Sequence, residues 1–400
     1  MEIRPILSAM LRNKTGAILI ALQIAFTLAV VTNAFFIIYQ RWEKINRPSG
    51  MDMQNIVTSR VQWVGQDVDY KAEILRDLEA LKAIPGVTHV TTSNAIPLSG
   101  GGSSRGVSAE RTEDTEWTAT GSFLLTQDGL DSLGLNLVSG RNFTLNDVVW
   151  FDPEVGELAQ NVIITQALAE HIYPDENAVG KTLYMNDSEL TVIGIVERMH
   201  GSWVSWSGLE RNMLVPMVFP GSSISYIIRT QPGLTEEVRS QVKQTLLDIN
   251  NRRVIRRIRV LEDVATSSYG SDSDMMVILS SVVCLLLLIT VVGIVGLAAF
   301  SVNQRTRQIG TRRALGARRY QILRYFLVEN WLITSIGLTL GVLLASAFNY
   351  YLVVHFELER LDWFYIPMGM AILWLLGLFA VYGPARRASM VSPAIATRTV

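Results

Sequence analysis

The sequence predicts a membrane protein with four transmembrane α-helices and a large external α/β domain of two lobes. Two observations predict this class. Four uncharged, apolar runs are each long enough to cross a bilayer, whereas residues 43–274, between the first and second run, have the mixed composition of a soluble domain. The whole chain is 49% apolar and 18% charged, which is typical of a protein shared between membrane and water.

The first apolar run extends from Thr15 to Gln40 and follows three basic residues in segment 1–14. A signal peptide is the competing interpretation, because a basic segment also precedes the apolar core of such peptides. Signal cores are about 7–15 residues long, and this run is much longer. We therefore predict an uncleaved first transmembrane helix with a stalk, 15–42.

The other three apolar runs divide the remainder of the chain. The fourth is expected to end at Gly383-Pro384, since this pair is a common helix stop. The predicted segments are a stalk with the second span (275–304), a basic loop (305–325), the third span (326–354), a short external loop (355–362), the fourth span (363–385) and a tail (386–400).

The basic loop fixes the predicted orientation. The stretch Arg305–Arg324 holds seven arginines and no acidic residue, and basic loops are retained on the cytoplasmic side of a membrane. Both termini are then cytoplasmic, and residues 43–274 are external. The loop 355–362 contains three acidic residues (Glu357, Glu359, Asp362), as expected outside. The first two runs are longer than a bilayer of about 30 Å requires, so they are predicted to continue as stalks under the external domain.

The external domain contains a weak internal repeat. Each copy is expected to form strand, helix and strand, which predicts a ferredoxin-like inner lobe from residues 50–109 and 221–265. The strands are predicted at 54–61, 87–92, 224–230 and 254–260, and the helices at 71–83 and 235–249, the latter capped by Thr235.

A mixed α/β outer lobe, 110–220, is predicted to be inserted between these halves. Its expected strands are 161–165, 190–196 and 213–219, with a small helix near 167–173. The Gly- and Ser-rich segment Ser99–Gly106 is predicted to be a flexible loop. That loop is either a mobile tip that meets a substrate or an ordinary surface loop.

We find no residue pattern for catalysis, for a cofactor or for a metal. The single cysteine, Cys284, lies in a predicted span, and the four histidines lack metal-ligand spacing. Gly180-Lys181-Thr182 resembles the end of a phosphate-binding loop, but Asp175 stands where that loop requires glycine. The basic strand Arg252–Arg259 is interpreted as a solvated face or a lipid-headgroup contact rather than a nucleic-acid site. The spans show no polar path, which disfavours a channel.

The segment Arg307–Ala317, RQIGTRRALGA, resembles the FtsX-type core of MacB-like ABC transporter permeases. Several further segments agree with this family, and the resemblance covers essentially the whole chain. They are Ile322, Phe326, Glu329, the pair Gly337/Gly341, Gly140–Phe143, Ala167–Pro174, Val179–Thr182, Thr191–Val196, Pro384–Ala388 and Ser392-Pro393.

The resemblance implies a multi-pass permease of the bacterial inner membrane, non-catalytic itself, that works with two ABC ATPase subunits. ATP and Mg would be bound by these partners, and a second permease, identical or a paralogue, would complete the complex. A periplasmic adaptor and an outer-membrane channel are further expected partners, and nucleic acid is not. The residues implied to couple to the ATPase are Arg305, Arg307, Gln308, Ile309, Gly310, Arg312, Arg313, Ala314, Leu315, Gly316 and Ala317.

Export or extraction of a peptide, a lipid-like molecule or an antibiotic is the implied activity. The alternative is an FtsX-like module that moves an external enzyme or sensor and transports nothing. A membrane-anchored receptor is disfavoured, because it would leave the third and fourth spans without a role. Gln308 stands where the family commonly has Glu, and a neutral contact is about half as strong as a charged one. Thr311 also replaces a residue that is more often apolar. We therefore hypothesise pairing with a non-identical permease.

Overall fold

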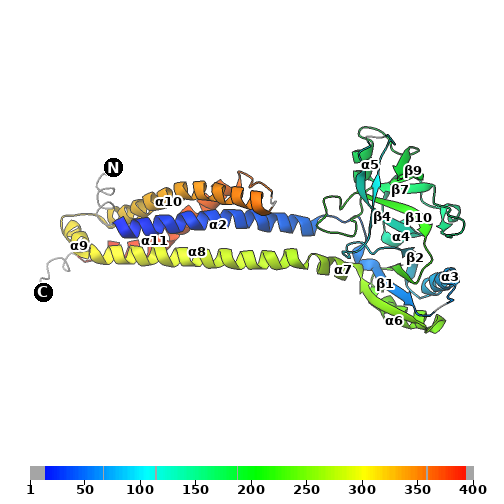
Figure 1. Ribbon diagram of the computed structural model, residues 1–400. Coiled ribbons are helices and arrows are strands. Elements are labelled where there is room, and N and C mark those ends of the chain that lie inside the picture. The colour runs from blue at the N-terminus through cyan, green and yellow to red at the C-terminus, as the bar shows by residue number, and fades with distance from the viewer. Residues whose placement is uncertain (1–13, 66, 113–114, 187, 357–358, 393–400) are drawn as a thin grey trace. The chain divides into compact units, whose positions relative to one another are not determined.

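The computed structural model describes residues 14–65, 67–112, 115–186, 188–356 and 359–392. The chain separates into a helical unit, residues 14–46 and 272–392, and an α/β unit, Arg47–Ser271 (Figure 1). The predicted N-terminal segment as far as residue 13, the acidic Glu357 and the last part of the tail, 393–400, lie outside the described residues.

Four long helices form the helical unit, and each is apolar and long enough to cross a membrane, as predicted. They are α2 (Lys14–Asn46), α8 (Gly270–Gln304), α10 (Arg319–Phe356) and α11 (Tyr365–Ser389). The prediction that the last helix ends at Gly383-Pro384 is wrong, because α11 continues to Ser389 with Pro384 inside it. Gly383 has no Cβ to clash with the proline ring, so the helix can pass through this position.

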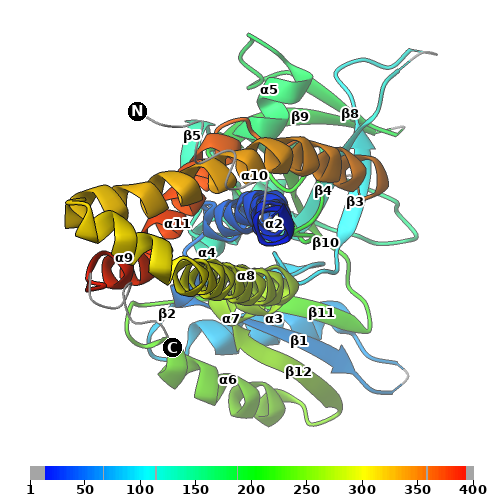
Figure 2. The same ribbon diagram turned by 90° about the vertical axis from the view of Figure 1, so that its left-hand side faces the viewer.

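Helices α2 and α10 approach each other through glycines. A Cβ added to Gly337 would lie 2.8 Å from the carbonyl oxygen of Ala21, and one added to Gly341 would lie 2.9 Å from the Leu28 side chain. Small residues allow such close backbone contact in membrane helices. Viewed along the helices, α2 lies between α8 on one side and α10 on the other (Figure 2).

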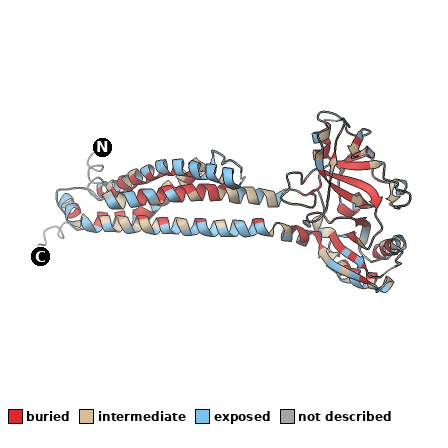
Figure 3. Cartoon of the chain, viewed as in Figure 1, coloured by how far each residue is buried: buried red, intermediate tan, exposed pale blue. Residues whose placement is uncertain are grey.

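Helix α8 is the least covered of the four. Only 17% of its most apolar 18-residue stretch is buried, and exposed residues follow each other along most of its length (Figure 3). Its contact with α2 includes a hydrogen bond of 2.9 Å between the buried hydroxyls of Thr27 and Thr290. At the other end of the two helices, Asp272 forms ion pairs with Arg41 and with Lys44. These ion pairs therefore join the two helices at the ends that are nearest in sequence to the α/β unit.

The α/β unit contains a four-stranded antiparallel sheet in the order β12-β1-β11-β2. Helices α3 (Tyr70–Lys82) and α6 (Thr235–Ile249) pack their apolar faces on one side of it. The strands are β1 (Ile56–Trp63), β2 (Val87–Ser93), β11 (Ser223–Thr230) and β12 (Arg253–Val260). This order confirms the ferredoxin-like prediction. Thr235 is the first helical residue rather than the cap, which is Leu234.

The second lobe is built on an eight-stranded mixed sheet with the main order β3-β4-β10-β7-β9-β5. Its strands are β3 (Ser103–Val107), β4 (Thr118–Leu125), β5 (Leu137–Gly140), β6 (Val149–Trp150), β7 (Asn161–Thr165), β8 (Thr182–Met185), β9 (Ser188–Val196) and β10 (Asn212–Val218). The remaining short helices of the α/β unit are η1 (Met53–Asn55), α4 (Gly129–Leu133), η2 (Leu145–Asp147), α5 (Gln166–Ile172) and α7 (Leu261–Ser268).

Strand β3 corrects two predictions. It occupies the end of the segment predicted to be a flexible loop, and it belongs to the second sheet although it precedes residue 110. Pairing with β4, from Ser103 opposite Ser122 to Val107 opposite Thr118, gives this segment a regular ladder. The composition of this segment is typical of a loop. It forms a strand because it pairs with β4, and composition alone does not report such tertiary pairing.

The two lobes share one apolar core. It unites Ile56 and Ile227, on the face of the four-stranded sheet opposite α3 and α6, with Phe123 and Leu214 of the second sheet. All four side chains are at most 1% exposed. Burial of this kind stabilises the folded unit by about 1.5–3 kcal/mol for each large apolar side chain.

Candidate coupling site

The predicted coupling segment forms a short helix, α9 (Thr306–Ala314), between α8 and α10. The helix ends in a Schellman turn, in which the Ala317 amide donates to the Arg312 carbonyl at 3.0 Å and the Gly316 amide donates to that of Arg313 at 3.2 Å. Gly316 has φ +94°, which side-chain-bearing residues rarely adopt. The Ala-Leu-Gly-Ala sequence is therefore explained by the turn that links α9 to α10.

Two of the predicted coupling residues face inward. Ile309 is 5% exposed and shares an apolar cluster with Ile322 and Phe326 of α10 and Ala385 of α11. Gly310, beside it, is also buried. These residues pack α9 against α10 and α11 within the helical unit.

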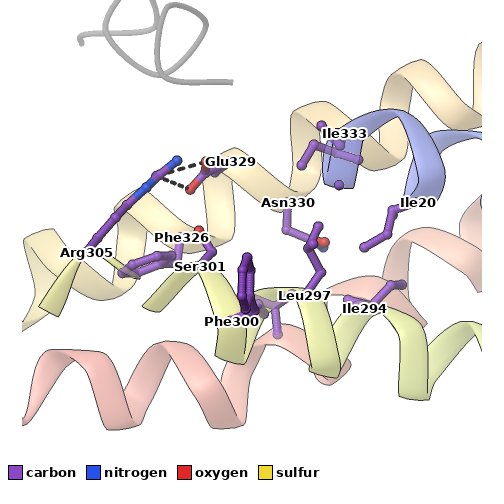
Figure 4. Close-up of a pocket in the computed structure, with 14 residues that line it drawn as sticks. Ile20, Ile294, Leu297, Phe300, Ser301, Arg305, Phe326, Glu329, Asn330 and Ile333 are labelled. Atoms are coloured by element: carbon purple, nitrogen blue, oxygen red, sulfur yellow. Dashed lines mark hydrogen bonds and ion pairs between the residues drawn. The ribbon is translucent and has the colours of Figure 1, made fainter. Parts of the chain in front are cut away.

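Arg305 is also engaged within the chain. Its Nη1 lies 3.0 and 3.1 Å from the two carboxylate oxygens of Glu329, and 3.1 Å from the Tyr325 hydroxyl. Figure 4 shows the Arg305 and Glu329 side chains pointing toward each other beside a small cavity of about 60 Å³, whose lining includes Phe326 and Asn330. This pair closes the junction between α8 and α10.

The other arginines of α9 differ in their surroundings. Arg313 is half-buried and donates from Nη1 to the Ala317 carbonyl at 3.2 Å, so it supports the turn. Arg312 is exposed, and its guanidinium lies 5.4 Å from the centre of the Tyr325 ring. A cation–π contact of this kind holds an arginine in place while leaving its donors available. Arg312 is thus a preorganised, outward-facing cation.

The outward face of the segment is basic with an apolar centre. Leu315 is 84% exposed and Tyr320, at the start of α10, is 66% exposed. The exposed residues among those predicted to couple are Arg307, Gln308, Arg312, Ala314, Leu315 and Gly316. A notch of about 220 Å³ between α9 and α10 is lined by Gln308, Arg312 and Tyr325 among others. Arginine forks around an exposed leucine and tyrosine suit a protein partner that carries carboxylates.

The sequence-based prediction missed Tyr320 and Tyr325. Both stand in a run of arginines, and aromatic residues beside arginines are a known signature of interfaces, so a signal was present. Within the described ranges, no group of three His, Cys, Asp or Glu side chains is placed to hold a metal ion.

Two protein families match this chain. The FtsX-like permease C-terminal family matches residues 280–393, and the MacB-like periplasmic core domain matches residues 17–245. The ABC transporter permease YknZ of Bacillus subtilis (strain 168) is 26% identical over 332 residues, which cover 80% of this chain and 78% of YknZ. The macrolide export ATP-binding/permease protein MacB of Neisseria meningitidis (serogroup A) is 29% identical over 290 residues, which cover 66% of this chain and only 41% of MacB.

Two solved structures also resemble part of the chain. The extracellular domain of YknZ covers 50% of this chain and 100% of that domain, with 19% identity and a TM-score of 0.33. The periplasmic region of MacB from Actinobacillus actinomycetemcomitans covers 56% of this chain and 97% of that region, with 18% identity and a TM-score of 0.35.

Proposed function

The chain belongs to the MacB-like, FtsX-type family of ABC transporter permeases, and from this premise we propose that it couples ATP hydrolysis on partner ATPase subunits to motion of its α/β unit. In this proposal the chain lies in a bacterial inner membrane with both termini and α9 in the cytoplasm. The positive charge of the segment 305–324 supports this orientation.

The observation that carries the proposal is the construction of α9. Its outward face offers exposed Arg307, Arg312 and Leu315 to a partner, while Ile309 and the Arg305–Glu329 pair fix it to the helical unit. A short helix that is exposed on one side and anchored on the other can pass on a push. Closure of two ATPases around bound ATP and Mg would supply that push.

The long helices α2 and α8 provide the proposed relay. They contain 33 and 35 residues, which at 1.5 Å per residue correspond to about 50 Å, against about 30 Å for the bilayer core. The ion pairs of Asp272 with Arg41 and Lys44 couple the two helices beyond the most apolar stretch. A displacement of one helix is therefore shared with the other before it reaches the α/β unit.

A second permease is part of the proposal. The exposed, apolar surface of α8 suits a partner helix as well as lipid. Gln308 in place of the usual acidic residue favours a non-identical permease, and isolation of an active complex with only this permease would contradict that choice. A periplasmic adaptor and an outer-membrane channel are expected if the complex exports its cargo.

We propose a peptide, a lipid-like molecule or an antibiotic as cargo, handled on the outer side of the membrane. An adaptor or an outer-membrane channel in the purified complex supports export, whereas a bound cell-wall hydrolase supports an FtsX-like regulatory module instead.

The test is purification of the tagged full chain from its native cell in mild detergent, with partners identified by mass spectrometry. We expect an ABC ATPase to co-purify with the wild type and to be lost from an Arg307→Glu/Arg312→Glu variant. The matched control is Arg386→Glu/Arg387→Glu, which changes the same charge at two exposed arginines of α11. Equal ATPase recovery with all three proteins would place the coupling surface elsewhere.

A further inference from the structure

A cleft of about 650 Å³ opens in the α/β unit between the two lobes. It lies on the face of the four-stranded sheet opposite α3 and α6, where Thr58, Arg60 and Ser225 follow the buried Ile56 and Ile227 of the shared core. The C-terminal end of α7 and the segment from Asn94 to Ser103 form its other walls. The cleft is therefore the polar continuation of an apolar lobe–lobe contact.

Among the described residues, three arginines line this cleft and no acidic side chain does. They are Arg60 of β1 and Arg257 and Arg259 of β12. Arg60 donates from Nε to the Ser223 hydroxyl and Arg259 from Nη2 to the Ser267 hydroxyl. Within the part of the chain that the structure describes, none of the three is paired with a carboxylate. Their remaining donors and their charge are available to a ligand.

The position of Arg257 requires a distortion of β12. Thr58 pairs with Arg259 and Arg60 with Arg256, so β12 carries one extra residue in a β-bulge. Arg257 stands in this bulge with φ +54°, a left-handed conformation that is unfavourable for a residue with a Cβ. Bulges re-aim side chains, and strain of this kind collects at functional sites. Glycine would relieve the strain but would remove the guanidinium from the cleft.

Two of the neighbouring polar side chains, Asn94 and Ser268, already have partners. The Asn94 amide donates to the Ser122 carbonyl and accepts from the Leu124 amide, and the Ser268 hydroxyl donates to the Leu98 carbonyl. The backbone at Gly101 is open, since a Cβ there would meet no atom within 4 Å. The arginines are thus the groups that would recognise a ligand, with free space around an unshielded backbone segment beside them.

We propose that this cleft binds a phosphate group, carried by a small soluble molecule or by a lipid headgroup. Three positive charges exceed what one carboxylate balances, whereas a phosphate monoester carries a charge of about −1.5 to −2 and three acceptor oxygens. Planar guanidinium groups bind such oxygens in pairs. The site is separate from α9, so it goes beyond the coupling role proposed above.

Arg253, in the same basic strand, shows that the cleft arginines are distinct from structural ones. Its side chain is fully buried and binds both carboxylate oxygens of Asp77, at 2.6 and 2.7 Å, and Glu73 at 2.6 Å. The Tyr226 hydroxyl donates to the same Asp77 at 2.8 Å. The charge of Arg253 is thus paired with carboxylates inside the lobe.

Isothermal titration calorimetry on the full chain in an uncharged detergent tests the proposal, with glycerol 3-phosphate and inorganic phosphate as soluble probes and succinate as a dicarboxylate control. We expect Arg257→Glu and Arg60→Glu each to weaken phosphate binding about tenfold or more. Arg252→Glu is the matched control, because Arg252 is exposed in the same segment but does not line the cleft. It should bind like the wild type.

Two further arms complete the test. A fluorescent phosphatidic acid added to the same micelles distinguishes the sources, since binding of this lipid alone assigns a headgroup and binding of glycerol 3-phosphate assigns a soluble ligand. Arg257→Gly guards against misfolding, because it should melt no lower than the wild type and still lose binding. Three results would each overturn the proposal. They are the absence of binding to every phosphate probe, binding of succinate as tight as that of phosphate, and an equal loss of binding in Arg252→Glu.

Discussion

Arg305 and Glu329 stand 24 residues apart in the chain, yet one guanidinium nitrogen of Arg305 contacts both carboxylate oxygens of Glu329. The side chains are only 18% and 11% exposed. The pair joins the end of α8 to the body of α10, at the point where α9 turns away from both. In the function proposed above, it is the contact through which a displaced α9 would act on both long helices.

Glu329→Gln should therefore separate binding from coupling. The substitution leaves the Arg305 charge without a carboxylate, and removing one partner of a well-buried pair costs about 3–5 kcal/mol, which partial exposure reduces to about 1–3 kcal/mol here. Chemical unfolding in detergent measures this loss. The outward face is unchanged, so the ATPase should still co-purify but show less permease-dependent hydrolysis.

The double variant Arg305→Gln/Glu329→Gln is the control for that experiment. Removing both charges eliminates the uncompensated one, so the double variant should lose less stability than the sum of the two single variants. Additive losses would mean that the pair contributes nothing beyond its separate side chains.

Gly316→Ala should disturb the α9 turn. Its φ of +94° costs a residue with a Cβ about 1 kcal/mol, and relaxation of the turn displaces the neighbouring Leu315. We expect weaker ATPase recovery in the co-purification. Gly296→Ala is the matched control, because Gly296 lies within α8, has no positive φ and leaves room for a Cβ. Equal recovery from both variants would remove the turn from the coupling surface.

Val242→Asp should unfold the ferredoxin-like lobe. Val242 is fully buried among the side chains that join α6 to the sheet, and a buried carboxylate without a partner costs roughly 3 kcal/mol or more. Limited proteolysis of the full chain should then cleave within residues 47–271. Asp248, already on the exposed side of α6, supplies a control as Asp248→Asn, which should resist protease like the wild type.

Acid should destabilise the α/β unit through His200. Burial lowers the pKa of His200 to about 4, opposed by Glu210 and assisted by the charges of Arg47 and Arg198. Above pH 6.5 the imidazole is neutral in both states and adds no pH dependence. Between pH 6.5 and 4 the unfolded chain takes up a proton that the folded chain does not, so stability falls by up to about 1.4 kcal/mol per pH unit.

Urea unfolding at a series of pH values measures this slope. His200→Gln should flatten it, whereas His171→Gln, at an exposed position in the second lobe, should keep it. A slope that is unchanged in His200→Gln would assign the acid sensitivity to other groups.

Periodicity in the sequence was sufficient for the helices and for the ferredoxin-like lobe. In α3, Ile74, Leu78 and Leu81 recur at helical spacing, which predicts one buried face, and the structure packs all three into the core with the sheet. Strand β3 was missed because Ser103–Val107 acquires its conformation from β4 and not from its own composition. The course of α11 through Pro384 was missed for a related reason, since a breaker acts only when its neighbours cannot accommodate it.

The sequence was sufficient to locate the candidate coupling site, but not to tell its inward-facing residues from its outward-facing ones. The run of arginines identifies the segment, whereas the partners that turn Arg305 inward and hold Arg312 outward, Glu329 and Tyr325, are contributed by α10. The cleft that we propose to bind phosphate could not be predicted from the sequence. Arg60 and Arg257 are nearly 200 residues apart, and only the β1–β12 pairing brings them to one surface.

The pairing of β1 with β12 has a mechanical consequence. Strand β1 is the first strand after α2, and β12 is the last strand before α8. The two strands are antiparallel neighbours, with Val57 opposite Val260. Residues 47–55 join α2 to β1 and residues 261–269 join β12 to α8, so both connections leave the same end of one strand pair. A force that draws the ends of α2 and α8 apart would therefore load the hydrogen bonds of this one ladder.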